Sequence, residues 1–182
     1  MASRYDDELW ELVPADPGPP PAHLAEFVRG LGPVGRALDV GCGDGRLSAA
    51  LDAEALTAAD VSAVALERAR TRLPGAALVE LDPDAPFPLD DASFDLVLCA
   101  ETVEHVRDVQ LLLSEIRRVL RPGGELALTT PAAPPLVRPG EPFSPHLRRF
   151  TRRSLSRVLG DLGFEMRSLE RRSRTLLARA TR

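Results

Sequence analysis

The 182-residue sequence predicts an α/β fold in which a doubly wound, mostly parallel sheet of seven strands ends in an antiparallel strand. Three observations predict it. Short apolar stretches alternate with longer segments of helical periodicity, which is typical of repeated strand–helix units. A glycine-rich turn follows the first apolar stretch, as at a ligand-binding strand end. The last two apolar stretches lie too close together for a crossover, so they must pair antiparallel.

The first half of the chain supplies three strands. Residues 1–21 are polar and close in a proline-rich run that stops regular structure, so we expect a lid segment there and one domain over residues 22–182. Residues 46–51 should begin a helix directly after the glycine-rich turn, and Ser62 should cap another that ends at Leu73. An earlier helical face is formed by Leu24, Phe27, Val28 and Leu31. The expected strands are residues 37–40, 55–59 and 76–81.

The second half supplies four strands, expected at residues 94–99 and 125–130 and as a hairpin within residues 164–181 that turns near Ser173. A long proline-rich loop, residues 131–150, should cross the carboxyl edge of the sheet, and such loops are usually functional. Thr151 should cap the helix that follows. A core-facing helix precedes the fifth strand, with apolar positions Val109, Leu112, Leu113, Ile116, Val119 and Leu120.

Composition and charge exclude several classes of protein. No stretch of 18 apolar residues predicts a membrane span, the acidic N-terminus is unlike a signal peptide, and Cys42 and Cys99 are expected to be reduced core residues. We therefore expect a cytoplasmic location without a membrane partner. The absence of lysine excludes a Walker A loop and Schiff-base chemistry.

Charge is divided unevenly along the chain. Residues 1–104 hold 20 acids and 7 bases, a net charge of −13, whereas residues 105–182 hold 7 acids and 16 bases, a net charge of +9. This division indicates either solvated helix faces or a basic rim that favours an anionic acceptor. Aromatic residues make up 4% of the chain and no aromatic-rich basic surface is evident, so no nucleic-acid partner is expected.

The glycine-rich turn, residues 38–45, is the most informative feature and has the sequence Leu-Asp-Val-Gly-Cys-Gly-Asp-Gly. Its three glycines suit a turn of unusual dihedrals where the backbone approaches a ligand closely. The spacing is one residue tighter than the G-x-G-x-x-G fingerprint of dinucleotide-binding proteins. Asp39 and Asp44 lie in and beside the turn, which favours a cationic ligand with an amino group over a pyrophosphate.

This turn resembles motif I of the class I S-adenosylmethionine (SAM) methyltransferases, and Asp60 matches the acid that binds the SAM ribose in that family. The resemblance covers roughly residues 24–180 and implies a Rossmann-like fold, SAM as the cofactor and methyl transfer. Three further segments carry it in the family's order: residues 86–97 leading into the fourth strand, 101–106 after that strand, and 120–128 leading into the fifth.

The resemblance also implies roles for individual residues at the strand ends. Asp39 would help to bind the methionine ammonium and Asp60 would accept both ribose hydroxyls. Asp82, or Asp84 in its place, would lie near the adenine amino group, unless both belong to a solvated turn. The expected cofactor-binding residues are Asp39, Gly41, Cys42, Gly43, Asp60, Val61, Asp82 and Glu101.

His105 and His146 are the expected catalytic residues. His105 ends the loop after the fourth strand, close to where the methyl group should point, and His146 lies in the long loop. Residues 146–151 resemble the H-x-R-x-F-T segment of type 11 small-molecule methyltransferases. The remaining histidine, His23, is expected to be exposed.

Glu101, Glu104 and His105 form an E-x-x-E-H group whose oxygen and nitrogen atoms suit a divalent ion. The group resembles the metal-binding motif of ubiquinone-pathway O-methyltransferases and of small-RNA 2′-O-methyltransferases. It also resembles relatives for which no metal is implied, and we expect no metal here. His105 would then be a proton acceptor, a substrate-facing residue or a helix cap.

Together these features predict a SAM-dependent methyltransferase with a small-molecule acceptor, oxygen being the expected acceptor atom, that acts as a monomer or a homodimer. The alternatives are a metal-assisted RNA 2′-O-methyltransferase, a non-catalytic SAM-binding protein and an NAD-dependent oxidoreductase. The acceptor pocket is expected between residues 1–20 and 131–150. Tyr5 and Trp10 could close over the cofactor, or Trp10 could anchor its segment to the core.

Overall fold

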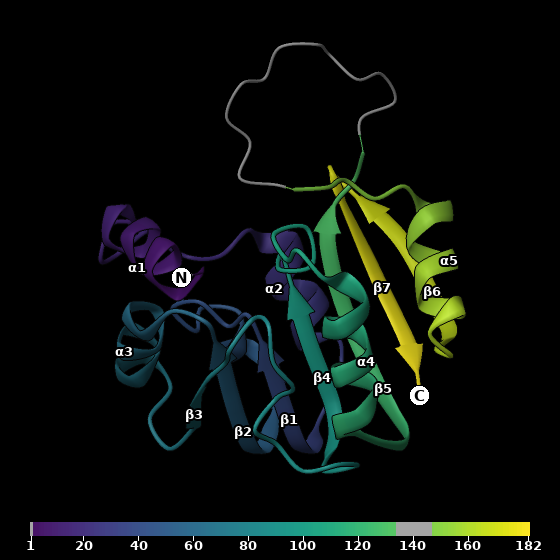
Figure 1. Ribbon diagram of the computed structural model, residues 1–182, viewed down its shortest axis with the longest axis horizontal. Coiled ribbons are helices and arrows are strands. Elements are labelled where there is room, and N and C mark those ends of the chain that lie inside the picture. The colour runs from purple at the N-terminus through teal and green to yellow at the C-terminus, as the bar shows by residue number, and fades with distance from the viewer. Residues whose placement is uncertain (1, 134–146) are drawn as a thin grey trace.

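The computed structural model describes residues 2–133 and 147–182, which contain a seven-stranded sheet of order β3-β2-β1-β4-β5-β7-β6 (Figure 1). Strand β7 pairs antiparallel with both β5 and β6, and the pairings among the first five strands are parallel. The predicted fold class, including its antiparallel C-terminal strand, is therefore confirmed. The strands are β1 (Val34–Val40), β2 (Ala53–Asp60), β3 (Ala77–Glu80), β4 (Phe94–Ala100), β5 (Leu120–Pro131), β6 (Glu165–Arg172) and β7 (Thr175–Thr181).

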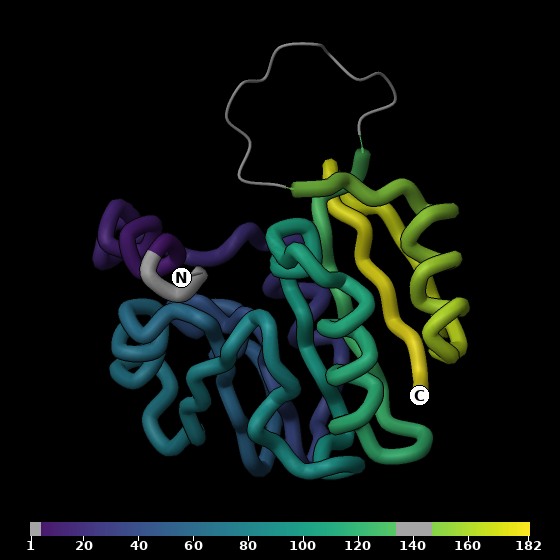
Figure 2. Tube along the Cα trace, viewed as in Figure 1, coloured from purple at the N-terminus to yellow at the C-terminus, as the bar shows by residue number. Residues whose placement is uncertain are grey.

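Helices lie on both faces of this sheet. In Figure 1, α4 and α5 cover the near face, α2 lies behind the sheet, and α1 lies above α3 at the carboxyl edge of the first strands. The trace in Figure 2 shows β7 running back between β5 and β6 toward the C-terminus. The helices are α1 (Ala2–Leu12), α2 (Ala22–Arg29), α3 (Ala63–Arg72), α4 (Val109–Val119) and α5 (Arg152–Asp161).

Alternation along the central strands builds two apolar layers. Leu38 and Val97 belong to the large core cluster that also contains the buried side chains of α4 and α5. Leu96 and Leu98 belong to a second cluster with Val28 of α2. Successive side chains of a strand point to opposite faces, so the central strands are buried on both sides, as expected for a doubly wound sheet.

In the described part of the chain, three helices begin at side-chain caps. Ser62 accepts a hydrogen bond from the backbone of Ala65, and Thr151 forms a capping box with Ser154, as predicted for these helices. Asp108 caps α4 in the same way but is not predicted from the sequence. The first two caps follow directly from the pattern of a polar residue before a periodic apolar run.

The prediction of a helix over residues 46–51 is wrong, because the chain forms only a single 3₁₀ turn at Ser48–Ala50. Few residues separate the glycine-rich turn from Ala53, where β2 begins. An α-helix advances only about 1.5 Å per residue, whereas a strand advances about 3.3 Å per residue. A helix there would be too short to return the chain to the opposite edge of the sheet, so the connection is more extended.

No helix is predicted from the sequence within residues 1–21, yet α1 forms there and packs on α3. Within the long loop, residues 134–146, which include the expected catalytic His146, lie outside the described residues. Within the described residues, no helix combines the length and the apolar character needed to cross a membrane.

Candidate functional site

Asp60 at the end of β2 organises the glycine-rich turn. Its 6% exposed side chain accepts hydrogen bonds from the backbone N–H of Gly43 at 2.8 Å and of Ser62 at 2.9 Å, one on each carboxylate oxygen. Burial raises the pKa of Asp60, and these two bonds oppose that shift. Because a carboxylate oxygen can accept more than one hydrogen bond, both oxygens keep capacity for hydroxyl donors. Asp60 therefore fits the role of ribose acceptor expected for it.

Asp39 at the end of β1 keeps one carboxylate oxygen without a partner. Its Oδ2 accepts a hydrogen bond from the Ser48 hydroxyl at 2.5 Å, while the buried Oδ1 has no hydrogen-bond partner among the described residues. Burial raises the pKa of Asp39 to about 7. An unpaired buried acceptor is unfavourable until a donor reaches it. The methionine ammonium expected at Asp39 is such a donor.

The first two glycines of the turn allow close contacts that a side chain would block. Gly41 has φ +74, and a Cβ there would lie 2.3 Å from the Thr102 hydroxyl oxygen. Gly43 has φ +54, and a Cβ there would lie 2.6 Å from the Trp10 ring. Between them, the Cys42 thiol is buried, which raises its pKa. Cys42 can therefore offer a ligand its backbone but not a reactive thiolate.

Asp44 is not available to a cationic ligand, contrary to the expectation from the sequence. Its Oδ2 lies 2.9 Å from Arg72 and its Oδ1 lies 3.1 Å from Arg46. Arg72 also donates to the Asp44 carbonyl oxygen at 2.5 Å. Two arginines thus neutralise this buried carboxylate and tie the turn to the end of α3. Asp44 Oδ2 accepts no hydrogen bond in the described part of the chain, but it is ion-paired with Arg72, whereas Asp39 Oδ1 faces no such arginine.

Asp82 lies at the end of β3, beside the end of β2, because the Leu81 backbone N–H donates to the Asp60 carbonyl at 2.9 Å. Asp82 is exposed, and its carboxylate accepts a hydrogen bond from the Asp84 backbone at 2.9 Å. The carboxylate therefore stabilises its own turn. Val61, half-buried after β2, packs against the core.

Helix α1 is fastened to this edge by side-chain contacts. Asp7 accepts hydrogen bonds from the Ser62 hydroxyl at 2.6 Å and the Val64 backbone at 3.2 Å, and these bonds lower its pKa. The guanidinium of Arg68 lies 5.8 Å from the Trp10 ring centroid. With the same ring against Gly43, these contacts make Trp10 an anchor for α1, whereas Tyr5 is 60% exposed.

The ends of β4 and β5 hold two glutamates, each bonded to a threonine. Thr129 Oγ1 donates to Glu101 Oε1, and Thr130 Oγ1 donates to Glu104 Oε2, both at 2.9 Å. Consecutive residues of a strand point to opposite faces, so the two glutamates are bonded to threonine side chains of β5 that point in opposite directions. Burial is the main cause that raises the pKa of each carboxyl to about 7. Both groups can therefore exchange protons near neutral pH.

Two histidines lie near these glutamates. His105 has a 42% exposed side chain, and its Nε2 is 3.9 Å from Glu104 Oε1. His23 of α2 is half-buried, not exposed as predicted, with Nε2 3.2 Å from the Thr175 hydroxyl, and it lowers the pKa of Glu101. The sequence could not reveal this position, because Thr175 lies 152 residues away.

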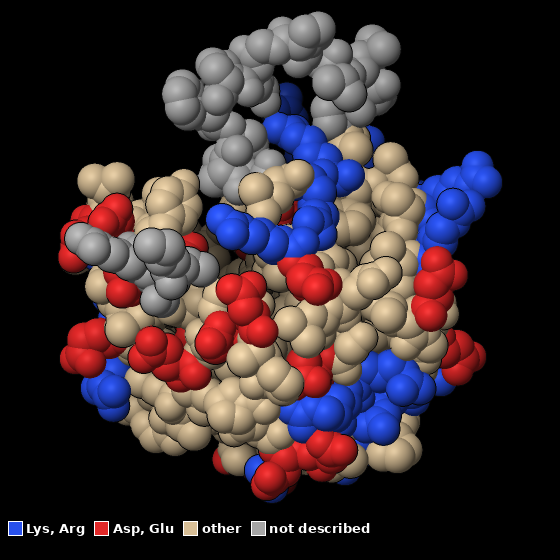
Figure 3. Space-filling view, in the orientation of Figure 1, with Lys and Arg blue, Asp and Glu red and all other residues tan. Residues whose placement is uncertain are grey.

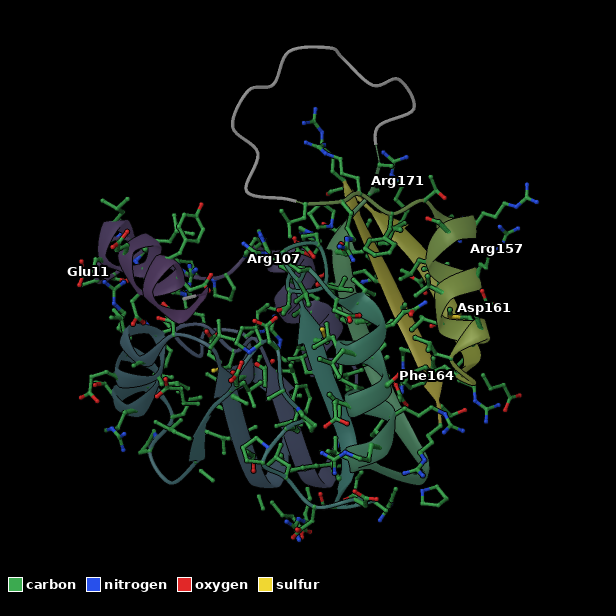
Figure 4. All side chains as sticks on the ribbon, in the orientation of Figure 1. Glu11, Arg107, Arg157, Asp161, Phe164 and Arg171 are labelled. Atoms are coloured by element: carbon green, nitrogen blue, oxygen red, sulfur yellow. The ribbon has the colours of Figure 1, made fainter. Side chains whose placement is uncertain are left out.

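The last part of the long loop lies against the loop after β4. The Leu147 backbone donates to the Glu104 carbonyl, and the Arg148 guanidinium donates to the Arg107 carbonyl, both at 2.8 Å. In Figure 4, Arg107 lies between α1 and the top of β4. The described residues of the loop thus border the same edge as the two glutamates.

The E-x-x-E-H group does not come together as a metal site within the described residues, where no three His, Cys, Asp or Glu side chains are placed to hold an ion. Glu101 and Glu104 are instead bonded to different threonines.

The charge division is visible on one face in Figure 3, where acidic residues gather over α1 and α3 and most arginines lie toward α4 and α5.

Comparison with known proteins identifies the family. Residues 38–128 match the model of the methyltransferase domain family. The chain belongs to this family. The predicted recognition as a class I SAM-dependent methyltransferase is therefore confirmed, and SAM is the cofactor of this enzyme class.

Relatives and solved structures agree with this assignment. The methyltransferase is 41% identical to a demethylmenaquinone methyltransferase of Clavibacter sepedonicus over 77% of its own length and 55% of the relative's. It is 37% identical to a malonyl-[acyl-carrier protein] O-methyltransferase of Enterobacter lignolyticus over 70% and 53%. It thus spans little more than half the length of these relatives. The fold matches a SAM-dependent methyltransferase structure from Aquifex aeolicus with TM-score 0.69 at 20% identity, covering 99% and 96% of the two chains.

Proposed function

We propose that this methyltransferase transfers the methyl group of SAM to an oxygen atom of a small molecule. The observation that carries the proposal is the group of proton-exchanging side chains at the ends of β4 and β5, on the same sheet edge as the cofactor residues. Glu101 and Glu104 have pKa values of about 7, and His105 lies beside Glu104. An oxygen acceptor needs such a group, because its hydroxyl must lose a proton during methylation.

The cofactor residues hold the donor in this proposal. SAM, when bound, supplies a methyl group on a sulfonium, which is already an excellent leaving group. The chain must then mainly align the acceptor with that methyl group. Asp60 binds the ribose hydroxyls, Asp39 binds the ammonium, and the glycine-rich turn allows the backbone to approach. Asp82, Val61, Cys42 and Glu101 remain proposed cofactor contacts.

The acceptor side of the proposal combines His105 with the surrounding segments. His105 accepts the proton, and His146 of the long loop is a second proposed catalytic residue. Helix α1, within the proposed lid segment of residues 1–21, and the loop of residues 131–150 border the acceptor pocket. Arg107 and Arg148 lie where they can attract an anionic acceptor. The Enterobacter relative's name as an O-methyltransferase supports oxygen as the acceptor atom.

Two binding experiments followed by a screen test this function. Calorimetry should detect SAM binding and should detect no comparable binding of NAD. Incubation with methyl-labelled SAM and a panel of hydroxy and carboxylic acids, with matched amines as controls, should label oxygen compounds. Tighter binding of NAD than of SAM would refute the assignment, and labelling confined to the amines would refute oxygen as the acceptor.

A further inference from the structure

Glu104 holds a buried carboxylate oxygen that the proposed function leaves without a role. The side chain is 1% exposed, and its Oε2 accepts the hydrogen bond from Thr130. Its Oε1 is buried and has no hydrogen-bond partner in the described part of the chain. Such an oxygen is costly to bury unless a donor can reach it. The relevant question is therefore which donor the fold places near Oε1.

The His105 ring is placed to supply this donor. Its Nε2 lies 3.9 Å from Glu104 Oε1, about 1 Å beyond a normal N–H···O hydrogen bond. The backbone of both residues is fixed, because His105 N–H donates to the Thr102 carbonyl at 2.9 Å and the Glu104 carbonyl accepts from Leu147 at 2.8 Å. Pairing of the two groups requires the half-exposed ring to move by about 1 Å toward Oε1.

Charged side chains from two parts of the chain interact with the His105 ring. Asp6 of α1 and Glu101 both interact with the imidazole, whose positive charge lowers the pKa of each. Arg107 also interacts with Asp6, whose pKa it lowers. Three carboxyl groups, those of Asp6, Glu101 and Glu104, thus face the ring from α1 and from its own loop. A positive charge that forms on the ring during a reaction therefore lies near carboxyl groups.

We propose that Glu104 is a positioning residue for His105. The carboxylate accepts a hydrogen bond from Nε2–H, which leaves Nδ1 to take a proton, and it stabilises the imidazolium that forms. The inference rests on the proposed transfer to oxygen. As the new O–CH3 bond forms, the S–CH3 bond breaks and its electron pair stays on sulfur. The acceptor's hydroxyl proton passes to Nδ1 and leaves through the exposed side of the ring.

Nuclear magnetic resonance of the histidine rings tests this pairing without an identified acceptor. The chain has three histidines, and the His105 signals are those missing from His105→Gln. In Glu104→Gln, the titration midpoint of the His105 ring should fall by about 1 pH unit, because an opposite charge within about 4–6 Å stabilises the cation by at least this amount. Glu54→Gln is the matched control, an exposed glutamate in β2. An unchanged midpoint in folded Glu104→Gln would overturn the proposal.

A second pair of variants covers the case in which Glu104→Gln does not fold. Thr130→Val removes the hydroxyl that holds Oε2, whereas Thr130→Ser keeps it. The midpoint should fall in the valine variant and stay at the wild-type value in the serine variant, and equal midpoints would again reject the pairing. SAM calorimetry on the same samples separates the two proposals. Absence of SAM binding in the wild type would remove the proposed function, whereas the ring titration tests the pairing independently.

Discussion

The two halves of the site hold their carboxylates in different ways. At the end of β2, Asp60 is bonded to backbone N–H groups of Gly43 and Ser62, although Asp39 at the end of β1 accepts from the Ser48 hydroxyl. At the ends of β4 and β5, Glu101 and Glu104 are bonded to threonine hydroxyls. Backbone donors are fixed by the fold, whereas hydroxyl donors rotate about their side chains. The position of the Asp60 carboxylate is therefore fixed by the backbone, and the acceptor edge can be adjusted by single side chains.

The two edges therefore suit different tasks, the binding of a cofactor whose groups do not vary and the transfer of a proton from an acceptor. A cofactor with fixed groups is best met by donors and acceptors whose positions follow from the strand ends and the glycine-rich turn. An acceptor-side residue can change its protonation with small changes in its surroundings, as the raised pKa values of Glu101 and Glu104 show. Substitutions at the first edge should therefore alter SAM binding, and substitutions at the second should alter proton transfer.

The largest effect is expected for Asp60→Ala. This substitution removes the proposed charge-assisted bonds to the ribose and also frees the Gly43 and Ser62 backbone groups. SAM affinity should fall by about 2 kcal/mol, roughly 30-fold, in calorimetry. Asp52→Ala is the control, because this exposed aspartate directly precedes β2 at the opposite end of the strand, and SAM affinity should be unchanged. Wild-type affinity in folded Asp60→Ala would remove the ribose assignment.

A smaller effect is expected where α1 meets the glycine-rich turn. Gly43→Ala imposes a side chain at φ +54 and places its Cβ 2.6 Å from the Trp10 ring, so the ring must move. The backbone strain alone costs about 1 kcal/mol. The emission of Trp10, the single tryptophan, should shift to longer wavelength as the ring becomes more exposed.

Gly75→Ala provides the matched control for this experiment. Gly75 has φ +90, and a Cβ there would meet nothing within 4 Å. It should therefore lower the melting temperature through backbone strain while leaving the Trp10 emission unchanged. Identical emission spectra for Gly43→Ala and the wild type would show that Trp10 does not depend on this contact.

The features that could be predicted from the sequence also differ between the two edges. Asp60, the glycines and the helix caps at Ser62 and Thr151 act on nearby parts of the chain or at strand ends, so local patterns locate them. The roles of Thr129, Thr130 and His23 depend on partners brought close only by the assembled sheet. The pairing of Asp44 with Arg72 was missed for the same reason, since these residues are 28 positions apart.

The 3₁₀ turn after the glycine-rich turn shows a different limit. A local pattern can suggest a helix over residues 46–51, but the distance that the chain must cover between two parallel strands decides the outcome. The seven strands and their antiparallel ending could be predicted from the sequence. The apolar period locates the strands, and the length of a connection decides whether two strands can run parallel. The local geometry of a short crossover depends on the whole sheet.

A third effect concerns stability against pH. Burial raises the pKa of Asp39 in the folded chain to about 7, above the value of about 3.9 for an unfolded aspartate. Between these values the folded chain keeps a proton that the unfolded chain has lost. The free energy of unfolding therefore decreases as pH rises from about 4 to 7 and levels off above pH 7. Glu101 and Glu104 act in the same direction.

Thermal unfolding of the ligand-free protein at pH 6 and pH 8 measures this effect. The wild type should be more stable at pH 6, and Asp39→Asn should lose about 1 kcal/mol of that difference. Asp82→Asn, a substitution at an exposed aspartate, should keep it. A pH difference that is the same in Asp39→Asn and the wild type would contradict a raised pKa at this buried aspartate.

The smallest effect is expected from metal removal. Glu101 and Glu104 are bonded to different threonines, and within the described residues no three His, Cys, Asp or Glu side chains are placed to hold an ion. SAM affinity should be equal in EDTA and in Mg²⁺ or Mn²⁺, and calorimetric titration with either ion alone should show no binding at micromolar concentrations. Once an acceptor is known, turnover should persist in EDTA, while His105→Ala should still slow it through the loss of the proton acceptor. Tight Mn²⁺ binding that disappears in both Glu101→Gln and Glu104→Gln would instead make this edge a metal centre and would assign His105 as a ligand.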